Sequence, residues 1–477
     1  MRRLHSAFRV SAFAIAAISV NGPSAADAID DYVRATMKAG KIPGVSIVVQ
    51  RDGKVIKSQG YGYANLEHQV PATADTIYQS GSVGKQFTAA GILLLVEDGK
   101  LSLDDRLPVH FPDAPASWHR ISIRHLLTHT SGIKDYGDEI DMRKDYSEDE
   151  YLAVIRTIPL EFEPGTQWSY SNTGYMLLGI LVSRLAGKHW GDYLAERLFK
   201  PLGMTTTRVI SERDIVPHRA AGYVLDAKDQ VKNQDWASPT ANSTGDGALY
   251  FSVKDLAAWN AALDQRKFLK PEHFEAWWTP VSLSNGTTYP YGFGWGIQEQ
   301  RGYPLIEHGG AWQGFRAAIA RYPEQRLSVS VLANLEGAEP ELIAKTIAGL
   351  AEPALKLPDA DAKVPDPDPA RTQRLRDVLA AYGDYRKLPG MAKGLAETAT
   401  GSAREASARN RTAAQLKAAK SFTFLGEDDL NGRTLHMYGE RVARTAYYAL
   451  QSGDERHVYR IHLNEQGQVL DFDSDER

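Results

Sequence analysis

Strand-like sequence occurs at both ends of residues 27–356, and this arrangement limits the folds open to the chain. The stretches "GVSIVVQ" from Gly44 and "VIKSQGYGY" from Val55 are separated by an Asp-Gly turn of the hairpin type. Strand pattern returns in "YGFGWGI", "LIEHGG", "GFRAAIARY" and "LSVSVLANL", all after residue 290. Residues 78–280 between them have mostly helical pattern. We therefore predict a two-lobed α/β body, in which one antiparallel sheet is interrupted by a large helical insertion and a cleft lies between the lobes.

The length of 477 residues exceeds what one hydrophobic core usually organises. Residues 357–369, "LPDADAKVPDPDP", are rich in proline and aspartate and predict an extended linker. Beyond it, helical pattern to about Lys420 precedes strand-like stretches such as "RTLHMYGE", "VARTAYYAL" and "HVYRIHLN". The predicted units are therefore a main body at 27–356 and a small α+β domain at 370–477.

The first residues have the order of a secretory leader. Arg2, Arg3 and Arg9 precede an uncharged apolar run at residues 10–20, and small residues follow it. The run is too short to span a bilayer, and no later stretch reaches that length. We expect a signal peptide at residues 1–26, a periplasmic or secreted mature protein and no transmembrane anchor. A buried N-terminal helix is the alternative.

Composition narrows the possible partners and cofactors. The formal net charge is −4, and removal of the leader would take away three arginines, so nucleic acid is not an expected partner. The absence of cysteine excludes disulfides, thiolate zinc sites and cysteine nucleophiles. Histidine and acidic residues have no metal-ligand spacing, so we expect neither a metal site nor a cofactor.

Ser82 and Lys85 open an apolar segment that predicts a buried helix closed at Gly99. Residues at i and i+3 share one face of a helix, so the lysine amine is expected beside the serine hydroxyl. A base near the hydroxyl would make the serine nucleophilic. The same spacing recurs at Ser131 and Lys134, but a glycine follows that serine and no apolar helix does. A helix-capping serine with a solvated lysine stays open as the alternative.

Two further elements carry polar groups suited to acyl transfer. Tyr170 and Asn172 lie where a loop enters a predicted helix, so a phenol and an amide are available for proton transfer and hydrogen bonding. His308, Gly309 and Gly310 close a predicted strand, where glycines would let a ligand approach the backbone. A strand-end turn with a surface histidine is the alternative for the second element.

In this order, the three elements resemble those of the serine β-lactamase and penicillin-binding protein superfamily. The likeness covers roughly residues 29–350 and includes further segments: "HLLTHTSGI", "YSNTGYMLLG", "PLGM", "GDGALYFSVKDLA" and "YGFGWGI". The resemblance implies the β-lactamase/transpeptidase-like fold. It also implies Ser82 as the acyl-accepting nucleophile, with Lys85 and Tyr170 as an acid/base pair. Asn172 would be a positioning amide, and the amides of Ser82 and Ala311 would form the oxyanion hole.

The third element departs from the lysine-threonine-glycine of typical β-lactamases, because His308 replaces the lysine. Such a histidine resembles that of D-aminopeptidases and some DD-peptidases. We place His308, with Gly310, on the substrate side of the cleft and expect it, when protonated, to attract a substrate carboxylate. His125 and His129 are expected to be structural.

The predicted reaction is two-step acyl transfer on an amide or ester. The leading substrate is a D-amino-acid-containing peptide, cleaved by a carboxypeptidase or aminopeptidase type of reaction. Small esters and slow turnover of β-lactams are alternatives, and so is a penicillin-binding or sensing protein without turnover. A nucleophile-elbow hydrolase is disfavoured, because no Gly-x-Ser-x-Gly follows a predicted strand. Residues 27–356 are expected to carry catalysis alone, and the oligomeric state stays open.

Overall fold

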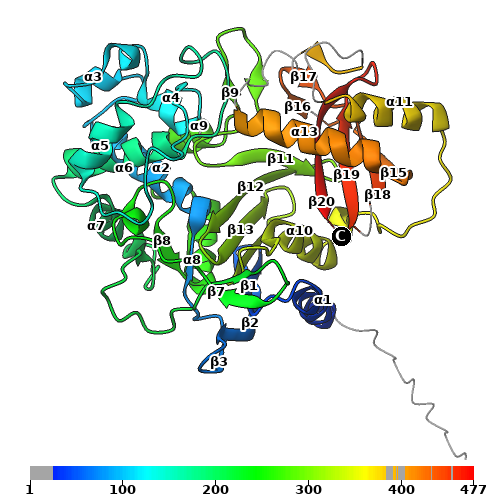
Figure 1. Ribbon diagram of the computed structural model, residues 1–477, viewed down its shortest axis with the longest axis horizontal. Coiled ribbons are helices and arrows are strands. Elements are labelled where there is room, and N and C mark those ends of the chain that lie inside the picture. The colour runs from blue at the N-terminus through cyan, green and yellow to red at the C-terminus, as the bar shows by residue number, and fades with distance from the viewer. Residues whose placement is uncertain are drawn as a thin grey trace, which may run out of the picture.

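The main sheet is antiparallel and joins the two ends of the main body (Figure 1). The computed structural model describes residues 25–382, 390–393, 395, 403–430, 432–433, 435–452 and 455–476. The strand order is β11-β12-β13-β14-β1-β2-β3. Their bounds are β1 Gly44–Arg51, β2 Lys54–Asn65, β3 Val70–Pro71, β11 Gly296–Gln300, β12 Tyr303–Trp312, β13 Phe315–Tyr322 and β14 Leu327–Ala333.

The centre of this sheet is buried on both faces. Val45 pairs with Ala333 and Ile47 with Val331, so β1 lies between β14 and β2. Helix α8 (Val253–Gln265) packs against β1 and β14, whereas α10 (Pro340–Ala351) packs against β13 and β14, with α1 (Ala25–Ala39) beside α10. Covered faces explain why β1 reads as a continuous apolar run. The predicted pairing of distant strands is confirmed.

Between β3 and β11 lies the predicted helical insertion. Its central helix, α2, is buried almost along its whole length and packs against α6 and α7. The helices of the insertion are η1 Gly81–Gly84, α2 Lys85–Glu97, α3 Leu107–His110, η2 Ala116–Trp118, α4 Ile123–Leu127, α5 Glu148–Ile155, α6 Asn172–Ala186, α7 Trp190–Leu194, η3 Ala195–Phe199, η4 Ala241–Ser243, α8 and α9 Pro271–Trp277. Short strands accompany them: β4 Tyr78–Gln79, β5 Arg208–Val209, β6 Tyr223–Leu225, β7 Val231–Asn233, β8 Leu249–Phe251, β9 Val281–Ser282 and β10 Thr288–Tyr289.

One predicted strand of the body is largely wrong. The stretch "YGFGWGI" contains no regular strand before Gly296, where β11 begins, and Tyr291 forms only an isolated bridge with Gly296. Gly294 has a φ of +73°, and a Cβ there would meet the backbone nitrogen of Gln86 at 2.9 Å. The glycine therefore lets the chain pass close to the start of α2, which an extended strand would not do.

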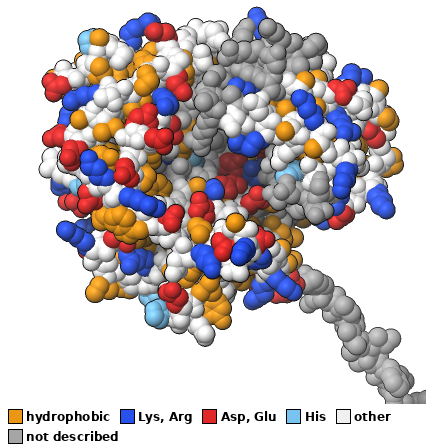
Figure 2. All heavy atoms as spheres, in the orientation of Figure 1, with side chains coloured by type: hydrophobic (Ala, Val, Ile, Leu, Met, Phe, Trp, Pro, Cys, Tyr) orange, Lys and Arg blue, Asp and Glu red, His pale blue; other side chains and the backbone are white. Residues whose placement is uncertain are grey.

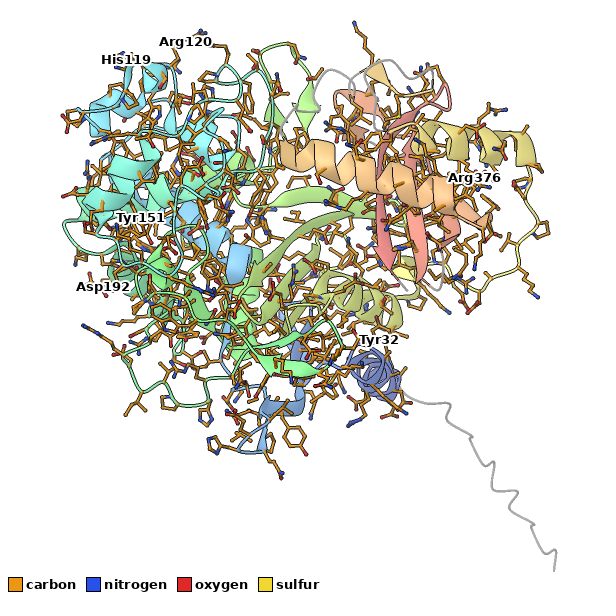
Figure 3. All side chains as sticks on the ribbon, in the orientation of Figure 1. Tyr32, His119, Arg120, Tyr151, Asp192 and Arg376 are labelled. Carbon is orange, nitrogen blue, oxygen red and sulfur yellow. The ribbon has the colours of Figure 1, made fainter. Side chains whose placement is uncertain are left out.

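A further sheet, together with α11 and α13, belongs to a separate C-terminal domain with its own apolar core. The sheet order is β15-β18-β19-β20, and α11 and α13 pack against each other and against this sheet. Figure 3 shows Arg376 of α11 on the opposite side of the molecule from Tyr151 of the helical lobe. The bounds are η5 Pro353–Leu355, α11 Pro369–Ala380, α13 Ala403–Ala418, β15 Ser421–Asp429, β16 His436–Met437, β17 Glu440–Arg441, β18 Arg444–Ser452, β19 Glu455–Leu463 and β20 Val469–Glu476.

The predicted fold class, a two-lobed α/β body with a small C-terminal α+β domain, is confirmed. Basic and acidic side chains are interspersed on the face shown in Figure 2. Within the described residues, no helix is both long and apolar enough to cross a membrane. Of the predicted signal peptide, residues 1–24 lie outside the described residues, and the last two belong to the start of α1.

Candidate active site

Ser82 and Lys85 meet where η1 passes into α2. Lys85 Nζ donates a hydrogen bond of 3.1 Å to Ser82 Oγ, and the lysine side chain is fully buried. The two residues are one turn apart, so the local helical geometry alone brings the amine to the hydroxyl. Ser82 lines a cavity of about 320 Å³ between the helical lobe and β12. The arrangement places the serine hydroxyl within hydrogen-bond distance of the lysine nitrogen, as proton transfer between them requires.

Two oxygen atoms from distant segments complete the surroundings of Lys85. Its Nζ also donates to Asn172 Oδ1 at 2.6 Å and to the backbone oxygen of Asp246 at 2.5 Å. With the bond to Ser82, these contacts use the three donors of an ammonium group. The Tyr170 ring centroid lies 4.9 Å from Nζ. Lys85 is therefore held in one position, directed at Ser82.

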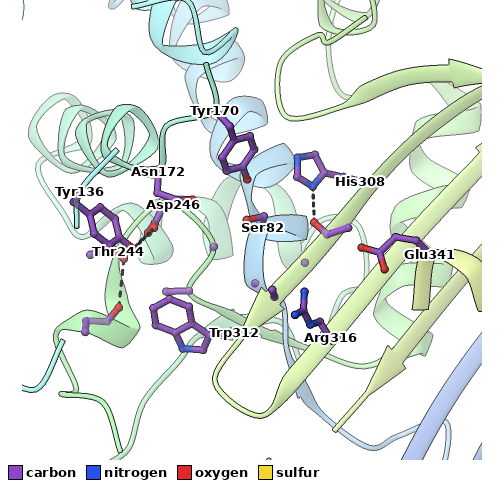
Figure 4. A pocket seen from close by; sticks show the side chains of 17 residues that line it. Ser82, Tyr136, Tyr170, Asn172, Thr244, Asp246, His308, Trp312, Arg316 and Glu341 are labelled. Carbon is purple, nitrogen blue, oxygen red and sulfur yellow. Dashed lines mark hydrogen bonds between the residues drawn. The ribbon is translucent and has the colours of Figure 1, made fainter. Parts of the chain in front are cut away.

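Tyr170 lines the same cavity, and its hydroxyl points toward Ser82 in Figure 4. Its ring packs on His129, with centroids 4.3 Å apart and planes 36° apart. The predicted acid/base pair is thus brought together with the predicted nucleophile. Their catalytic roles stay predictions.

Asn172 is the first residue of α6, close to the predicted start of this helix. The sequence did not predict that Asp135 holds its side-chain amide. Asp135 Oδ2 accepts a hydrogen bond of 3.0 Å from Asn172 Nδ2. Asp135 Oδ1 accepts from the backbone N–H groups of Asn172 and Thr173, which are unpaired donors at a helix N-terminus. Asp135 fixes the amide orientation that presents Oδ1 to Lys85. Nothing in the sequence around Asp135, which directly follows Lys134, predicted this role.

His308 lies within β12 and not at its end, because the strand continues to Trp312. The residue is partly exposed to the cavity, and the hydrogen bonds of its ring have a consistent direction. The Nδ1–H group donates to Gly309 O at 2.6 Å, so Nε2 accepts from the hydroxyl of Tyr291 at 2.8 Å. His129 Nε2 in turn lies 3.3 Å from that hydroxyl. These bonds suit a neutral imidazole.

The hydrogen bonds of His308 favour a neutral ring over the protonated ring that the sequence led us to expect. Burial, together with the neighbouring charge of Lys85, lowers the pKa of His308 to about 4. A carboxylate reader would need a pKa near or above neutrality. The predicted location is correct, since His308 lines the cavity beside Ser82. Its ring is held there by Tyr291 and by the backbone oxygen of Gly309.

We expect the ratio of kcat/KM between a substrate with a carboxylate and a neutral ester to stay constant within about twofold from roughly pH 5.5 to pH 8. The reason is that the pKa of His308 in the folded protein is lowered to about 4, below this pH range. The same shift affects stability. The contribution of His308 to the free energy of unfolding is present above the pKa of the unfolded state and is lost as the pH falls toward about 4. Parallel pH profiles for both substrates provide the measurement. The control is His308→Lys, which introduces a cation across the range and should favour the anionic substrate. A tenfold fall of the ratio in the parent between about pH 6 and pH 7 would contradict the neutral assignment.

Glycines let β12 pack directly against the turn that carries Ser82. A Cβ at Gly310 would meet Ser80 O at 2.1 Å, and one at Gly81 would meet the Ala311 nitrogen at 2.4 Å. Ala311 is exposed and lines the cavity with Ser82. The backbones of the two segments thus border one space, as an oxyanion hole formed by the amides of Ser82 and Ala311 requires.

Charged residues without a predicted role also line the cavity: Asp246, Arg316 and Glu341. The Asp246 carboxylate accepts hydrogen bonds from Thr244 Oγ1 and from the Tyr136 hydroxyl, both drawn in Figure 4. Burial raises the pKa of Glu341, which lies against Gly309. "GDGALYFSVKDLA" pointed to Asp246 as part of a family segment, whereas nothing in the sequence singled out Arg316 or Glu341. Within the described residues, no group of three or more His, Cys, Asp or Glu side chains is placed to hold a metal ion.

The second Ser-x-x-Lys pair lies away from this cavity. Ser131 is buried, and its Oγ accepts a hydrogen bond from the backbone N–H of Ile133. Lys134 forms an ion pair with Glu139 at 3.1 Å. His125 contributes to the capping box of α4 with Ser122. These contacts indicate a structural role for Ser131, Lys134 and His125.

Comparison with known proteins agrees with this geometry. The family model described as Beta-lactamase matches residues 29–352, which is more than half of the chain. The chain belongs to the beta-lactamase family. Penicillin-binding protein 4* of Bacillus subtilis is 31% identical over 309 residues, covering 61% of this chain and 68% of that protein. A D-aminopeptidase of Brucella anthropi is 30% identical over 329 residues, covering 67% of this chain and 61% of the relative.

Solved structures extend the comparison to the fold. The octameric penicillin-binding protein homologue from Pyrococcus abyssi is 25% identical with a TM-score of 0.63, and the match covers 94% of this chain and 89% of that one. Coverage of that extent includes the C-terminal sheet. The D-amino acid amidase from Ochrobactrum anthropi SV3 is 26% identical with a TM-score of 0.59, over 69% of this chain and 96% of that one. The D-aminopeptidase match spans less than two thirds of that protein.

Proposed function

We propose that this member of the beta-lactamase family is a serine hydrolase that works through an acyl-enzyme. The observation that carries the proposal is the 3.1 Å contact between Ser82 Oγ and Lys85 Nζ at the wall of an open cavity. Ser82 would attack the carbonyl carbon of an amide or ester. Its proton would pass to Lys85 or Tyr170 and then to the leaving group, and water would hydrolyse the acyl-enzyme.

The amides of Ser82 and Ala311 would stabilise the oxyanion formed in both steps. Asn172, oriented by Asp135, would keep Lys85 in place throughout the cycle. His308, Gly310 and the remaining cavity residues would contact the substrate. These roles need no cofactor.

The substrate class we propose is a peptide or amide that contains a D-amino acid. The D-aminopeptidase and D-amino acid amidase relatives support this class by their names. A neutral His308 removes one reason to expect recognition of a carboxylate at that position. The same relatives favour an aminopeptidase or amidase type of reaction over a carboxypeptidase type. Small esters, slow β-lactam turnover and binding without turnover are the other outcomes of the test.

The test is a substrate panel assayed with the full chain. D-alanine amide, a D-Ala-D-Ala-terminated peptide, a short ester and a penicillin are each compared with the matched L compound where one exists. We expect kcat/KM to be highest for the D-amide, by about tenfold or more over its L isomer. Ser82→Ala is the control in each assay. Turnover of the ester alone would replace the proposal with an esterase, and a stable penicilloyl adduct without turnover would indicate a binding protein.

We also propose that residues 1–26 are a cleaved signal peptide and that the mature protein is periplasmic or secreted. The basic, apolar and small residues of this segment support the proposal. The proposed units of the mature chain are the hydrolase domain at 27–356, the linker at 357–369 and the accessory domain at 370–477. N-terminal sequencing of protein recovered from a cell that exports it would reveal the cleavage site.

A further inference from the structure

A tight turn of the C-terminal domain reaches the hydrolase domain. β16 and β17 pair through Met437 and Glu440, which leaves Tyr438 and Gly439 as the two turn residues. Both have positive φ, +54° and +81°, as the central residues of a type I′ hairpin turn do. Positive φ is uncommon for a tyrosine and marks a position set by its surroundings. The side chain is buried, with only 4% of its surface exposed.

The turn contacts the β9–β10 hairpin of the hydrolase domain. Gly439 N–H donates a hydrogen bond of 3.0 Å to Thr288 Oγ1. The ring of Tyr438 meets the ring of Tyr289 edge to face, with centroids 5.7 Å apart and planes 78° apart. Edge-to-face pairs of this kind are attractive beyond the apolar area that they bury.

From Tyr289 the aromatic contacts continue to the proposed acid/base residue. Tyr289 stacks on Trp168 with centroids 3.9 Å apart and planes 9° apart. Trp168 lies two residues before Tyr170 and also contacts His129, which packs on the Tyr170 ring. Residues 161–171 form neither helix nor strand, so side-chain packing and separate backbone hydrogen bonds, such as that from Ser169 N–H to His129 O at 3.0 Å, hold this loop. The stack is one of the contacts that hold it.

Other contacts between the domains lie apart from the stack. Arg301 forms a bidentate ion pair with Asp428, with a shortest distance of 2.7 Å. The buried carboxylate of Glu299 accepts a hydrogen bond of 2.8 Å from Thr445 Oγ1. Loss of the Tyr438 ring therefore leaves the domains joined, and its effect on the loop can be measured separately.

We propose that Tyr438 is a positioning residue through which the C-terminal domain holds the loop of Trp168 and Tyr170 in its catalytic geometry. The inference rests on the proposed function of Tyr170. According to this inference, the C-terminal domain contributes to catalysis although it does not contact the substrate. A misplaced proton-transfer group slows the chemical step, while the walls that bind the substrate stay in place.

The test compares Tyr438→Ala with Tyr438→Phe in the full chain. The alanine variant should lower kcat for the best substrate by about tenfold with KM changed by less than about twofold. The phenylalanine variant keeps the ring against Tyr289 and loses only the hydroxyl that donates to Asp471, so its kcat should be close to that of the parent. The control is Arg433→Ala, which removes the ion pair with Glu324 between the domains but leaves the stack intact. Its kcat should be unchanged.

A second measurement does not depend on turnover. Hydrogen exchange of the peptide that covers residues 161–171 should be faster in Tyr438→Ala than in the parent, and unchanged in Tyr438→Phe and Arg433→Ala. Unchanged exchange in the alanine variant, or an equal loss of kcat in the phenylalanine variant, overturns the inference. If exchange is faster in Tyr438→Ala but the parent protein hydrolyses no substrate, the coupling of the domains is supported. That result counts against the proposed function.

Discussion

Ser82→Ala should abolish covalent labelling of the protein by penicillin or a fluorophosphonate and reduce hydrolysis of the best substrate by at least about 10³-fold. The reason is geometric. Ser82 Oγ combines a direct hydrogen bond from a buried lysine with a position on the cavity wall, between the glycine-rich β12 and the helical lobe. Alanine removes the atom that would become acylated. The measurement is intact-protein mass spectrometry after exposure to each reagent, together with steady-state kinetics.

Ser131→Ala is the matched control, since Ser131 belongs to the second Ser-x-x-Lys pair. Its hydroxyl accepts a hydrogen bond from Ile133 N–H away from the cavity. We expect normal labelling and a loss of about 1 kcal/mol in the free energy of unfolding from the lost hydrogen bond. An adduct mapped to Ser131, or labelling of the Ser82→Ala protein at the parent rate, would overturn the assignment of the nucleophile.

Lys85→Met should slow acylation of Ser82 by about 10² to 10⁴-fold, the range typical of a lost general base. Methionine occupies a similar volume in the buried site but has no donor and no basic nitrogen. Its effect on folding should also be large. Asn172 Oδ1 and Asp246 O each lose a donor, at about 1–3 kcal/mol for each acceptor left unsatisfied. Stopped-flow acylation and urea unfolding separate the two effects.

The corresponding control is Lys134→Met, which removes a partly exposed ion pair with Glu139. Exposed pairs contribute about 0–1 kcal/mol, so stability and acylation should both stay near the parent values. If Lys85→Met acylates at the parent rate while it remains folded, Lys85 is not the base. The proton path would then have to run through Tyr170.

The C-terminal contacts change one expectation based on the sequence. The Pro/Asp-rich segment at 357–369 suggested that residues 27–356 carry catalysis alone. Removal of the following domain would take away Tyr438 and Thr445, which donates a hydrogen bond to the buried Glu299 carboxylate. We now expect the shortened protein to have a reduced kcat, and its comparison with Tyr438→Ala would show how much of the loss is due to that ring.

The sequence by itself determined the features that depend on neighbouring residues or on repeated pattern. Ser82 and Lys85 are one helical turn apart, so their contact follows from local geometry. The β1–β2 hairpin follows from its turn, and the start of α6 at Asn172 was also predicted correctly. The antiparallel sheet with a helical insertion followed from the order of the strand and helix patterns.

Only the tertiary structure decided the features that depend on burial and on contacts between distant segments. The sequence alone gives no reason to expect a shifted pKa for His308, whereas desolvation and the neighbouring Lys85 in the fold lower that pKa to about 4. Asp135 reaches Asn172 across 37 positions of the chain, and Tyr438 reaches Tyr289 from another domain. Desolvation and long-range packing depend on residues that are close in space but distant in sequence, so the local sequence pattern does not predict them.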